Sequence, residues 1–201
     1  QRQMCIRDRE IRIKAGTYRG HVNIPADKKN LTLIGENAET TIITDDKNVY
    51  SLDANGQKLS TKASATVAVD ADFFSATQLT FANTAGNHGQ ALALYANGDG
   101  TSLRHCRLLG WQDTLRVERG RHYFGKCWIE GHCDFIYGNG TAVFDRCQID
   151  CLQSGYITAA STAPEREYGF VFLDCRITAR EVAKKVYLCL LYTSPSPRDR
   201  G

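Results

Sequence analysis

The sequence predicts an all-β protein built as a β-solenoid, in which the chain coils repeatedly and each coil is made of short strands and turns. Three observations support this class. Apolar residues alternate with polar ones in short runs, most runs end in glycine, asparagine or aspartate, and a cysteine-containing pattern recurs at a nearly constant interval. No long amphipathic helical pattern lies between the runs.

The alternating runs are spread along the first half of the chain. They are EIRIKAG from Glu10, NLTLIG from Asn30, TVAVD from Thr66, QLTFAN from Gln78 and ALALY from Ala91. Successive side chains of a strand face opposite sides, so each of these runs has one apolar face. Short strands of this kind form a core when each coil stacks on the next.

The repeat is clearest where leucine or isoleucine comes two residues after a cysteine, as in HCRLLG, KCWIEG, RCQID and DCRIT. The cysteines are Cys106, Cys127, Cys147 and Cys175, with spacings of 21, 20 and 28 residues. Stacked coils should align these cysteines as one interior ladder. A second ladder should contain Leu108, Ile129, Ile149 and Ile177. The longer last spacing predicts an inserted loop within QSGYITAASTAPEREYG. A sandwich of antiparallel strands is the alternative, but it does not require a cysteine at this interval.

Composition and charge fit one globular domain or a large part of one. The chain has 201 residues, of which 42% are hydrophobic and 23% charged, and no apolar run is long enough to span a membrane. The formal net charge of +3 comes entirely from the two ends, so no basic patch indicates a nucleic-acid partner. We expect a monomer without a nucleic-acid or membrane partner.

We expect a single, incomplete β-helix domain over residues 10–180. The ends, residues 1–9 and 187–201, share no pattern with the interior. They read like peptides translated from sequencing-adapter DNA, and we interpret them as non-native flanks.

Two acids occupy matching positions in neighbouring repeats. Asp113 comes seven residues after Cys106, and Asp134 comes seven residues after Cys127. Stacked coils should place both carboxyl groups on one face, separated by a sheet spacing of ~4.8 Å. Carboxyl groups that close do not ionise together, so one is predicted to act as an acid and the other as a base or nucleophile. The alternative is two unrelated acids that cap turns.

Two glutamines supply candidate hydrogen-bond donors near these acids. Gln112 directly precedes Asp113, and Gln90 opens an apolar strand one coil earlier. A glutamine amide can donate to a developing oxyanion. Gln90 could equally belong to a polar row on a solvated sheet face.

GWQDTL followed by GHCDFIYGNGTAVFDRC resembles the pectin methylesterases (pectinesterases), whose pattern is roughly GYQDTL and then G-x-V-DFIFGNA-x-AVF-x-x-C. The resemblance covers about residues 10–178 and implies a right-handed parallel β-helix. It also implies hydrolysis of the methyl esters of homogalacturonan (pectin) without a metal or other cofactor. A polymeric wall substrate implies a secreted or periplasmic enzyme.

The resemblance implies a role for each polar candidate. Asp134 would attack the ester carbonyl as the nucleophile, and Asp113 would give a proton to the leaving methoxide and then activate water. Gln112 and Gln90 would stabilise the oxyanion.

Four further residues are candidates for binding the substrate. Tyr95 and Tyr137 fall where the family has aromatic residues that contact the sugar chain, although each could equally serve packing. Arg116 takes the place of an aromatic residue and Trp111 the place of a tyrosine. Cys133 stands where valine is commoner.

The resemblance further implies an arginine, in an L-G-R-P-W motif downstream of GFVFLDCRIT, that holds the nucleophilic carboxylate. This chain continues as AREVAKKVYLCLLYTSPSPRDRG, and neither Arg166 nor Arg180 matches the motif. We therefore expect a truncated enzyme whose activity is reduced or lost.

The cysteines form no CxxC pair, so no zinc site is predicted. We interpret most of them as small buried hydrophobic residues. If any pair forms a disulfide, Cys127–Cys147 is the candidate, because the two should be stacked.

Two other functions remain open from the residues alone. A β-helix glycoside hydrolase could use Asp113 and Asp134, but an inverting one needs carboxyl groups roughly 6.5–9.5 Å apart, more than adjacent coils give. A non-catalytic solenoid could bind polysaccharide through its aromatic face.

Overall fold

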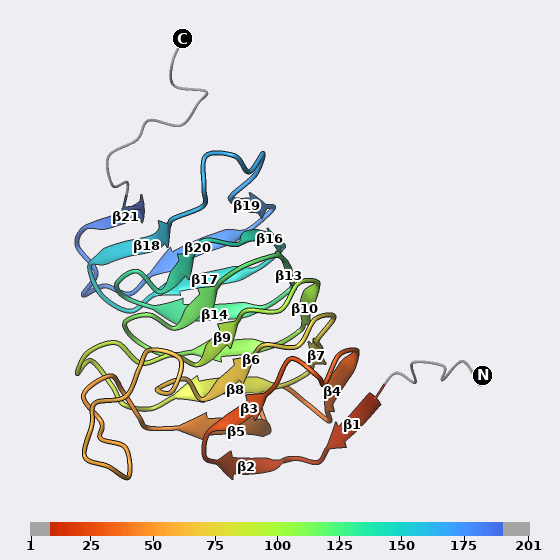
Figure 1. The fold of residues 1–201 in the computed structure, drawn as a ribbon. Coiled ribbons are helices and arrows are strands. Elements are labelled where there is room, and N and C mark those ends of the chain that lie inside the picture. The colour runs from red at the N-terminus through yellow and green to blue at the C-terminus, as the bar shows by residue number, and fades with distance from the viewer. Residues whose placement is uncertain (1–8, 191–201) are drawn as a thin grey trace.

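The computed structural model describes residues 9–190, and this range consists of strands and turns without an α-helix. Twenty-one strands form three seven-stranded sheets in which every strand pairing is parallel. Successive coils stack on one another (Figure 1), which confirms the predicted all-β solenoid. No helix in this range has the length and hydrophobicity that a membrane crossing requires.

Each coil contributes one strand to each sheet, in the order A, B, C. Sheet A contains β1 (Arg9–Ile13), β4 (Leu31–Gly35), β7 (Ser75–Thr77), β10 (Thr101–Arg104), β13 (Arg121–Gly125), β16 (Thr141–Asp145) and β19 (Phe170–Leu173). Sheet B contains β2 (Gly16–Arg19), β5 (Thr41–Asp45), β8 (Thr80–Asn83), β11 (Arg107–Leu109), β14 (Trp128–Gly131), β17 (Gln148–Cys151) and β20 (Arg176–Ala179). Sheet C contains β3 (Val22–Ile24), β6 (Val67–Val69), β9 (Leu94–Ala96), β12 (Leu115–Val117), β15 (Ile136–Gly138), β18 (Gly155–Ala160) and β21 (Val186–Cys189).

The boundaries differ in detail from those expected. Residues 1–8 and 191–201 of the expected flanks lie outside the described residues, as does Cys5, whereas β21 falls largely inside the C-terminal flank and pairs with β18. The long connection before Cys175 contains β18 and then a loop over residues 161–169.

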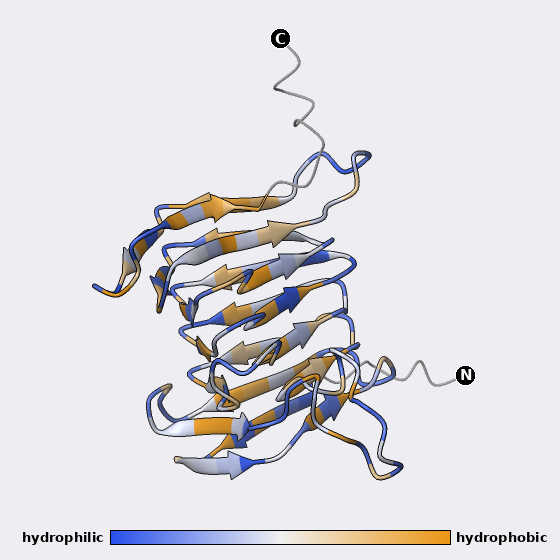
Figure 2. Cartoon of the chain, turned by 90° about the vertical axis from the view of Figure 1, so that its left-hand side faces the viewer, coloured by the Kyte–Doolittle hydropathy of each residue, from blue (hydrophilic) through white to orange (hydrophobic). Residues whose placement is uncertain are grey.

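The core fills the space enclosed by the three sheets. Phe124, Phe144 and Phe172 stack on successive coils of sheet A, with ring centroids 5.0 and 4.8 Å apart. Figure 2 shows that hydrophobic and hydrophilic segments alternate along strands that lie in stacked rows. Burial of one apolar face per strand therefore drives each coil to stack on the last.

The predicted isoleucine ladder is confirmed by the register of sheet B. Leu108 pairs with Ile129, Ile129 with Ile149, and Ile149 with Ile177. The first three are fully buried, whereas Ile177 is 45% exposed because it lies on the last coil of the sheet.

The cysteine ladder is also present, and its members are free thiols, as the interpretation of small buried hydrophobic residues predicts; the candidate Cys127–Cys147 disulfide is not formed. Cys127 and Cys147 are both buried free thiols. Each thiol contacts a backbone carbonyl of the preceding coil, Cys127 Sγ at 3.6 Å from Leu103 O and Cys147 Sγ at 3.2 Å from Phe124 O. The Cys127 thiol and burial both raise the pKa of Cys147, so its thiol stays protonated and unreactive.

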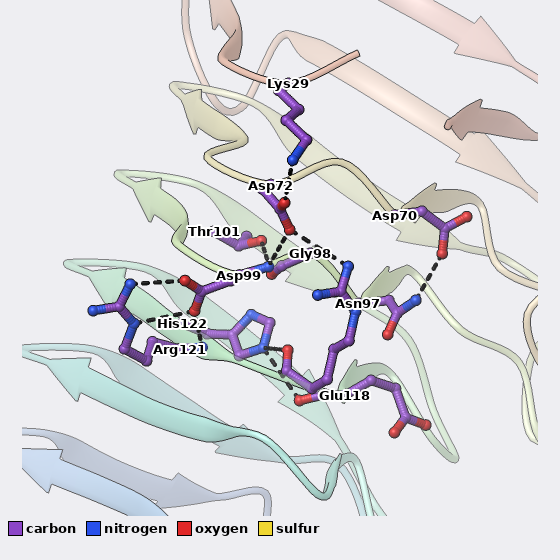
Figure 3. Close-up of polar contacts among 11 residues, drawn as sticks. Lys29, Asp70, Asp72, Asn97, Gly98, Asp99, Thr101, Glu118, Arg121 and His122 are labelled. Carbon is purple, nitrogen blue, oxygen red and sulfur yellow. Dashed lines mark hydrogen bonds and ion pairs between the residues drawn. The ribbon is translucent and has the colours of Figure 1, made fainter. Parts of the chain in front are cut away.

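Charged residues tie successive coils together where sheet C turns into sheet A (Figure 3). Asp72 Oδ1 accepts a hydrogen bond from the Asp99 amide at 3.0 Å, and Asp99 Oδ1 accepts one from the Arg121 amide at 2.8 Å. Lys29 forms an ion pair with Asp72, and the Arg121 guanidinium holds the pKa of Asp99 at about 2. This corner fixes the register of the coils by contacts outside the apolar core.

The isoleucine ladder of sheet B allows the same side-chain truncation to be compared on a buried coil and on the last coil. Ile149→Ala should lower the free energy of unfolding by about 2–5 kcal/mol, because it leaves a cavity at a fully buried position. Ile177→Ala removes the same atoms from the same column at an exposed position, and it should cost about 0.5 kcal/mol or less. Urea unfolding followed by circular dichroism measures both values, and equal losses would contradict this account of the core.

Candidate active site

The two acids lie at the corner where sheet B turns into sheet C. Gln112 forms a parallel bridge with Cys133, and Leu115 pairs with Ile136. Asp113 and Asp134 are therefore counterparts on adjacent coils, a rise of about 4.8 Å apart, as the matched spacing predicted.

Both acids have the same unusual backbone conformation. Asp113 has φ 66° and Asp134 has φ 48°, which lie in the left-handed region that non-glycine residues seldom adopt. Their amides donate to the next coil, Asp113 N to Cys133 O at 3.2 Å and Asp134 N to Tyr156 O at 2.8 Å. The same conformation recurs at the corner between sheets A and B, for example at Lys126 and Arg146, so it belongs to the turns of the solenoid as well as to the acids.

A glycine three residues before each acid makes this tight corner possible. A Cβ on Gly131 would lie 2.3 Å from the Phe135 Cβ, and one on Gly110 would lie 2.6 Å from the Thr114 Oγ1. Thr114 is fully buried and donates to Glu130 O at 2.9 Å, which links the corner of one coil to the strand of the next. The G-x-x-D pattern is therefore a backbone requirement as well as a chemical signature.

Asp113 is the more deeply buried acid, with 3% of its surface exposed. The pKa of Asp113 is raised to about 7, chiefly by burial; the neighbouring Asp134 adds to the rise, while Tyr137 and Arg116 oppose it. Asp113 therefore carries a proton over much of the range in which ordinary aspartates are ionised.

Asp134 is only partly buried, but its Oδ1 atom is enclosed and has no hydrogen-bond partner. Burial raises the pKa of Asp134, while the Cys133 thiol and His132 lower it. Because Asp134 is less buried than Asp113, it is the better placed of the two to be ionised. No arginine or lysine forms an ion pair with Asp134 within residues 9–190, so nothing there takes the part of the arginine that the resemblance implies.

Two predicted aromatic residues flank the acids in one column of sheet C. Tyr95 pairs with Arg116, and Arg116 pairs with Tyr137. The Arg116 guanidinium carbon lies 5.6 Å from the Tyr95 ring centroid and 5.3 Å from that of Tyr137. The Tyr137 hydroxyl is buried close to Asp113 and Arg116, but it makes no hydrogen bond of good geometry with either.

The remaining predicted residues lie on the same corner, with less defined contacts. Gln112 is half-buried, and its carbonyl oxygen accepts the Ala91 amide at 3.2 Å, which puts Gln90 on the coil before it. Gln90 is exposed, and its side chain makes no hydrogen bond to any described residue. Trp111 is half-buried and meets the edge of His132, with ring centroids 5.8 Å apart.

Sequence reasoning missed three residues of this site. Glu118 directly follows β12 and forms an ion pair with Arg116, a contact that the two-residue spacing could have revealed. Tyr156 occupies the place of Asp134 on the next coil and stacks on Tyr187 at 5.3 Å. His132 lies two residues before Asp134, and burial lowers its pKa.

The fold and these residues define a class of protein: a parallel β-helix with two in-register carboxyl groups of unequal burial, beside an aromatic column that follows the coils. Within residues 9–190, no group of three or more His, Cys, Asp or Glu side chains could hold a metal ion.

Comparison with known proteins gives the family within this class. The family model described as Pectinesterase matches residues 3–190, and the chain belongs to the pectinesterase family. It is 36% identical to Pectinesterase 31 of Arabidopsis thaliana over 184 residues, covering 89% of this chain and 58% of that protein. It is 40% identical to Pectinesterase/pectinesterase inhibitor U1 of Solanum lycopersicum, covering 84% of this chain and 29% of that protein.

Solved structures give the same family and the right-handed parallel β-helix fold. Pectin methylesterase PemA from Erwinia chrysanthemi matches with a TM-score of 0.80 at 33% identity, over 86% of this chain and 57% of that one. Pectin methylesterase from carrot matches with a TM-score of 0.79 at 39% identity, over 86% and 55%. A pectin methylesterase solved in complex with a hexasaccharide matches with a TM-score of 0.80 at 33% identity, over 86% and 57%. The chain therefore spans less than two thirds of each of these relatives.

The burial of Asp113 predicts a specific pH dependence of stability. Its pKa is raised on folding to about 7, so the folded state binds the extra proton between about pH 4 and pH 7. The raised pKa therefore stabilises the folded state at low pH by on the order of a few kcal/mol. This contribution to the free energy of unfolding falls as the pH rises above about 4 and is lost as the pH passes 7. Asp113→Asn should remove that loss.

Urea unfolding of the parent and Asp113→Asn at pH 5, 6, 7 and 8 tests this prediction. The difference in unfolding free energy between the two should shift in favour of the variant as the pH rises. A difference that is independent of pH would show that Asp113 titrates normally.

Proposed function

We propose that this site hydrolyses the methyl esters of homogalacturonan, giving methanol and a free galacturonate carboxylate. The observation that carries the proposal is the unequal burial of two carboxyl groups in register on adjacent coils. Asp113 is positioned to hold a proton and Asp134 to present an enclosed, unpaired oxygen. Family membership supports the ester as the substrate class over the glycosidic bond or a purely binding role.

In the first step, the Asp134 carboxylate attacks the ester carbonyl carbon. The carbonyl oxygen becomes an oxyanion, which the amide groups of Gln112 and Gln90 stabilise. Collapse of this intermediate breaks the bond to the methoxy oxygen. Asp113 gives its proton to that oxygen, so methanol leaves and an anhydride joins Asp134 to the sugar acid.

In the second step, Asp113 is ionised and accepts a proton from water. The hydroxide attacks the galacturonate carbonyl of the anhydride, and Asp134 leaves as a carboxylate. Asp113 is again protonated, so both acids return to their starting states. A pKa of about 7 suits both duties, because a group near neutrality can donate and accept with similar ease.

The column of Tyr95, Arg116 and Tyr137, with Trp111 beside it, would bind the polysaccharide along the coils. Aromatic rings suit the apolar faces of sugars, and the column lies next to the acids. A homologue's complex with a hexasaccharide supports an extended substrate. We further propose that residues 10–180 belong to one β-helix domain, that the chain acts as a monomer outside the cytoplasm, and that it needs no cofactor.

Methanol release tests the assignment of the nucleophile. The purified chain should release methanol from highly methyl-esterified pectin, at a rate reduced because no arginine pairs with Asp134 within residues 9–190. Asp134→Asn should lower that rate by a further factor of at least about 10³, because an amide oxygen is a poor nucleophile. Gas chromatography measures the methanol, and circular dichroism checks that the variant is folded. Activity retained by a folded Asp134→Asn variant would overturn the role of Asp134.

A matched change separates the two acids. Asp113→Asn keeps the carboxylate of Asp134 but removes the proton donor. It should therefore slow alcohol release from methyl esters more than from esters with a better leaving group. Esters with a better leaving group should be rescued in part, because they need less protonation. The comparison is made on the first turnover, which reports alcohol release before the anhydride is hydrolysed; equal losses for both kinds of ester in that phase would contradict the role of Asp113 as the acid.

A further inference from the structure

The connection from sheet B to sheet C is longer on the coil before the acids than on the coils that follow it. Residues 84–93 join β8 to β9, whereas the same connection contains only three to five residues on each of the next three coils. The first part of the long connection, residues 84–90, ends at Gln90 and is called the Gln90 loop below. This loop is therefore an extra segment at the corner where the acids lie.

Both ends of the Gln90 loop are fixed by backbone and side-chain contacts. Asn83, just before the loop, is buried, and its side chain donates to Leu92 O at 3.1 Å and accepts the Ala85 amide at 3.0 Å. At the other end, Gln90 O accepts the Val49 amide at 3.1 Å. These contacts hold the base of the loop and leave its tip to be held by something else.

The tip of the loop is tied to a distant coil by one hydrogen bond. Asn87 Nδ2 donates to Gln153 Oε1 at 3.2 Å. Gln153 lies in the connection of residues 152–154 after β17, which is the third strand beyond β8 in the order of sheet B. The two coils between these strands carry Asp113 and Asp134, so the Asn87–Gln153 tie joins the coil before the acids to the coil after them.

The position of Gln90 depends on its loop because its own side chain has no anchor. The Gln90 side chain is exposed and makes no hydrogen bond to any described residue, so the backbone alone places its amide relative to the acids. Gly86 has φ 74° and Gly89 has φ 110°, and glycine has more backbone freedom than any other residue. A loop with two such positions needs a contact at its tip to remain in one arrangement.

We propose that Asn87 and Gln153 are positioning residues, whose hydrogen bond holds the Gln90 loop in the arrangement in which the Gln90 amide donates to the oxyanion. This inference rests on the proposed function and adds two residues that act through Gln90. The oxyanion forms only after the ester is bound. Loss of the tie should therefore lower kcat more than it changes KM.

Alanine variants test the tie with and without turnover. Asn87→Ala and Gln153→Ala should each lower kcat for methanol release roughly 2- to 10-fold, the factor that corresponds to one neutral hydrogen bond. Hydrogen–deuterium exchange should become faster at the amides of residues 86–89 in both variants, because the tip is released. The hydrogen bond lies at the surface, so circular dichroism should show the parent's strand content.

An exchanged pair and a matched control separate the hydrogen bond from side-chain loss. Asn87→Gln combined with Gln153→Asn keeps both amide groups and the combined length of the two side chains. It should recover most of the parent's kcat and slow amide exchange, which neither alanine variant does. Asn55→Ala is the control, because Asn55 is also exposed on a loop and its side chain makes no hydrogen bond to any described residue. It should leave kcat unchanged.

A double-mutant cycle with Gln90→Ala tests whether the tie acts through Gln90. Asn87→Ala should cause little further loss of kcat in a chain that already carries Gln90→Ala, because the group that the tie positions is absent. A tie that supports the structure in general would lower kcat by the same factor in both backgrounds. That result would overturn the positioning role.

The possible results distinguish this inference from the function on which it rests. No methanol from the folded parent would overturn the proposed function and this inference with it. A Gln90→Ala variant with the parent's kcat would overturn the role of Gln90 as a donor, whatever the tie does. In an active parent that depends on Gln90, an unchanged kcat in Asn87→Ala would overturn only the positioning role of the tie.

Discussion

Backbone hydrogen bonding between successive coils is the interaction on which the whole site depends. It keeps each residue level with its counterpart on the coil before, which is twenty-one positions earlier in the run Leu94, Leu115 and Ile136 of sheet C. The same register brings Asp113 to the level of Asp134. A shift of one residue in one coil would turn every side chain of its strands to the opposite face and would disrupt the core and the site together.

Burial and a left-handed backbone make the two acids destabilising, and the packing of the core compensates for that cost. Burial that moves the pKa of Asp113 to about 7 costs on the order of a few kcal/mol at higher pH, and left-handed conformations at both acids add strain. Each buried ladder residue such as Ile129 or Phe124 contributes a similar amount in the opposite direction. The site therefore retains a desolvated carboxyl pair because the stacked core below it determines the backbone.

Much of this fold could be predicted because a solenoid converts spacing along the chain into spacing in space. The ladder from Leu108 to Ile177 and the alignment of the two acids followed from counting residues. The Cys127–Cys147 disulfide failed because stacking fixes the proximity of side chains, whereas the orientation of each thiol toward a carbonyl depends on local packing. Tyr156 escaped notice because the repeat lengthens just after Asp134, so a fixed interval no longer points to it.

Arg116, which stands where the family has an aromatic residue, acts electrostatically on the acid beside it. The Arg116 cation lowers the pKa of Asp113 and so opposes the effect of burial, which raises it. The two effects act on the two duties proposed for Asp113, because the protonated form is needed to release methanol and the ionised form to activate water. A side chain held between two tyrosine rings therefore helps to keep the pKa of Asp113 at about 7, where both forms are accessible.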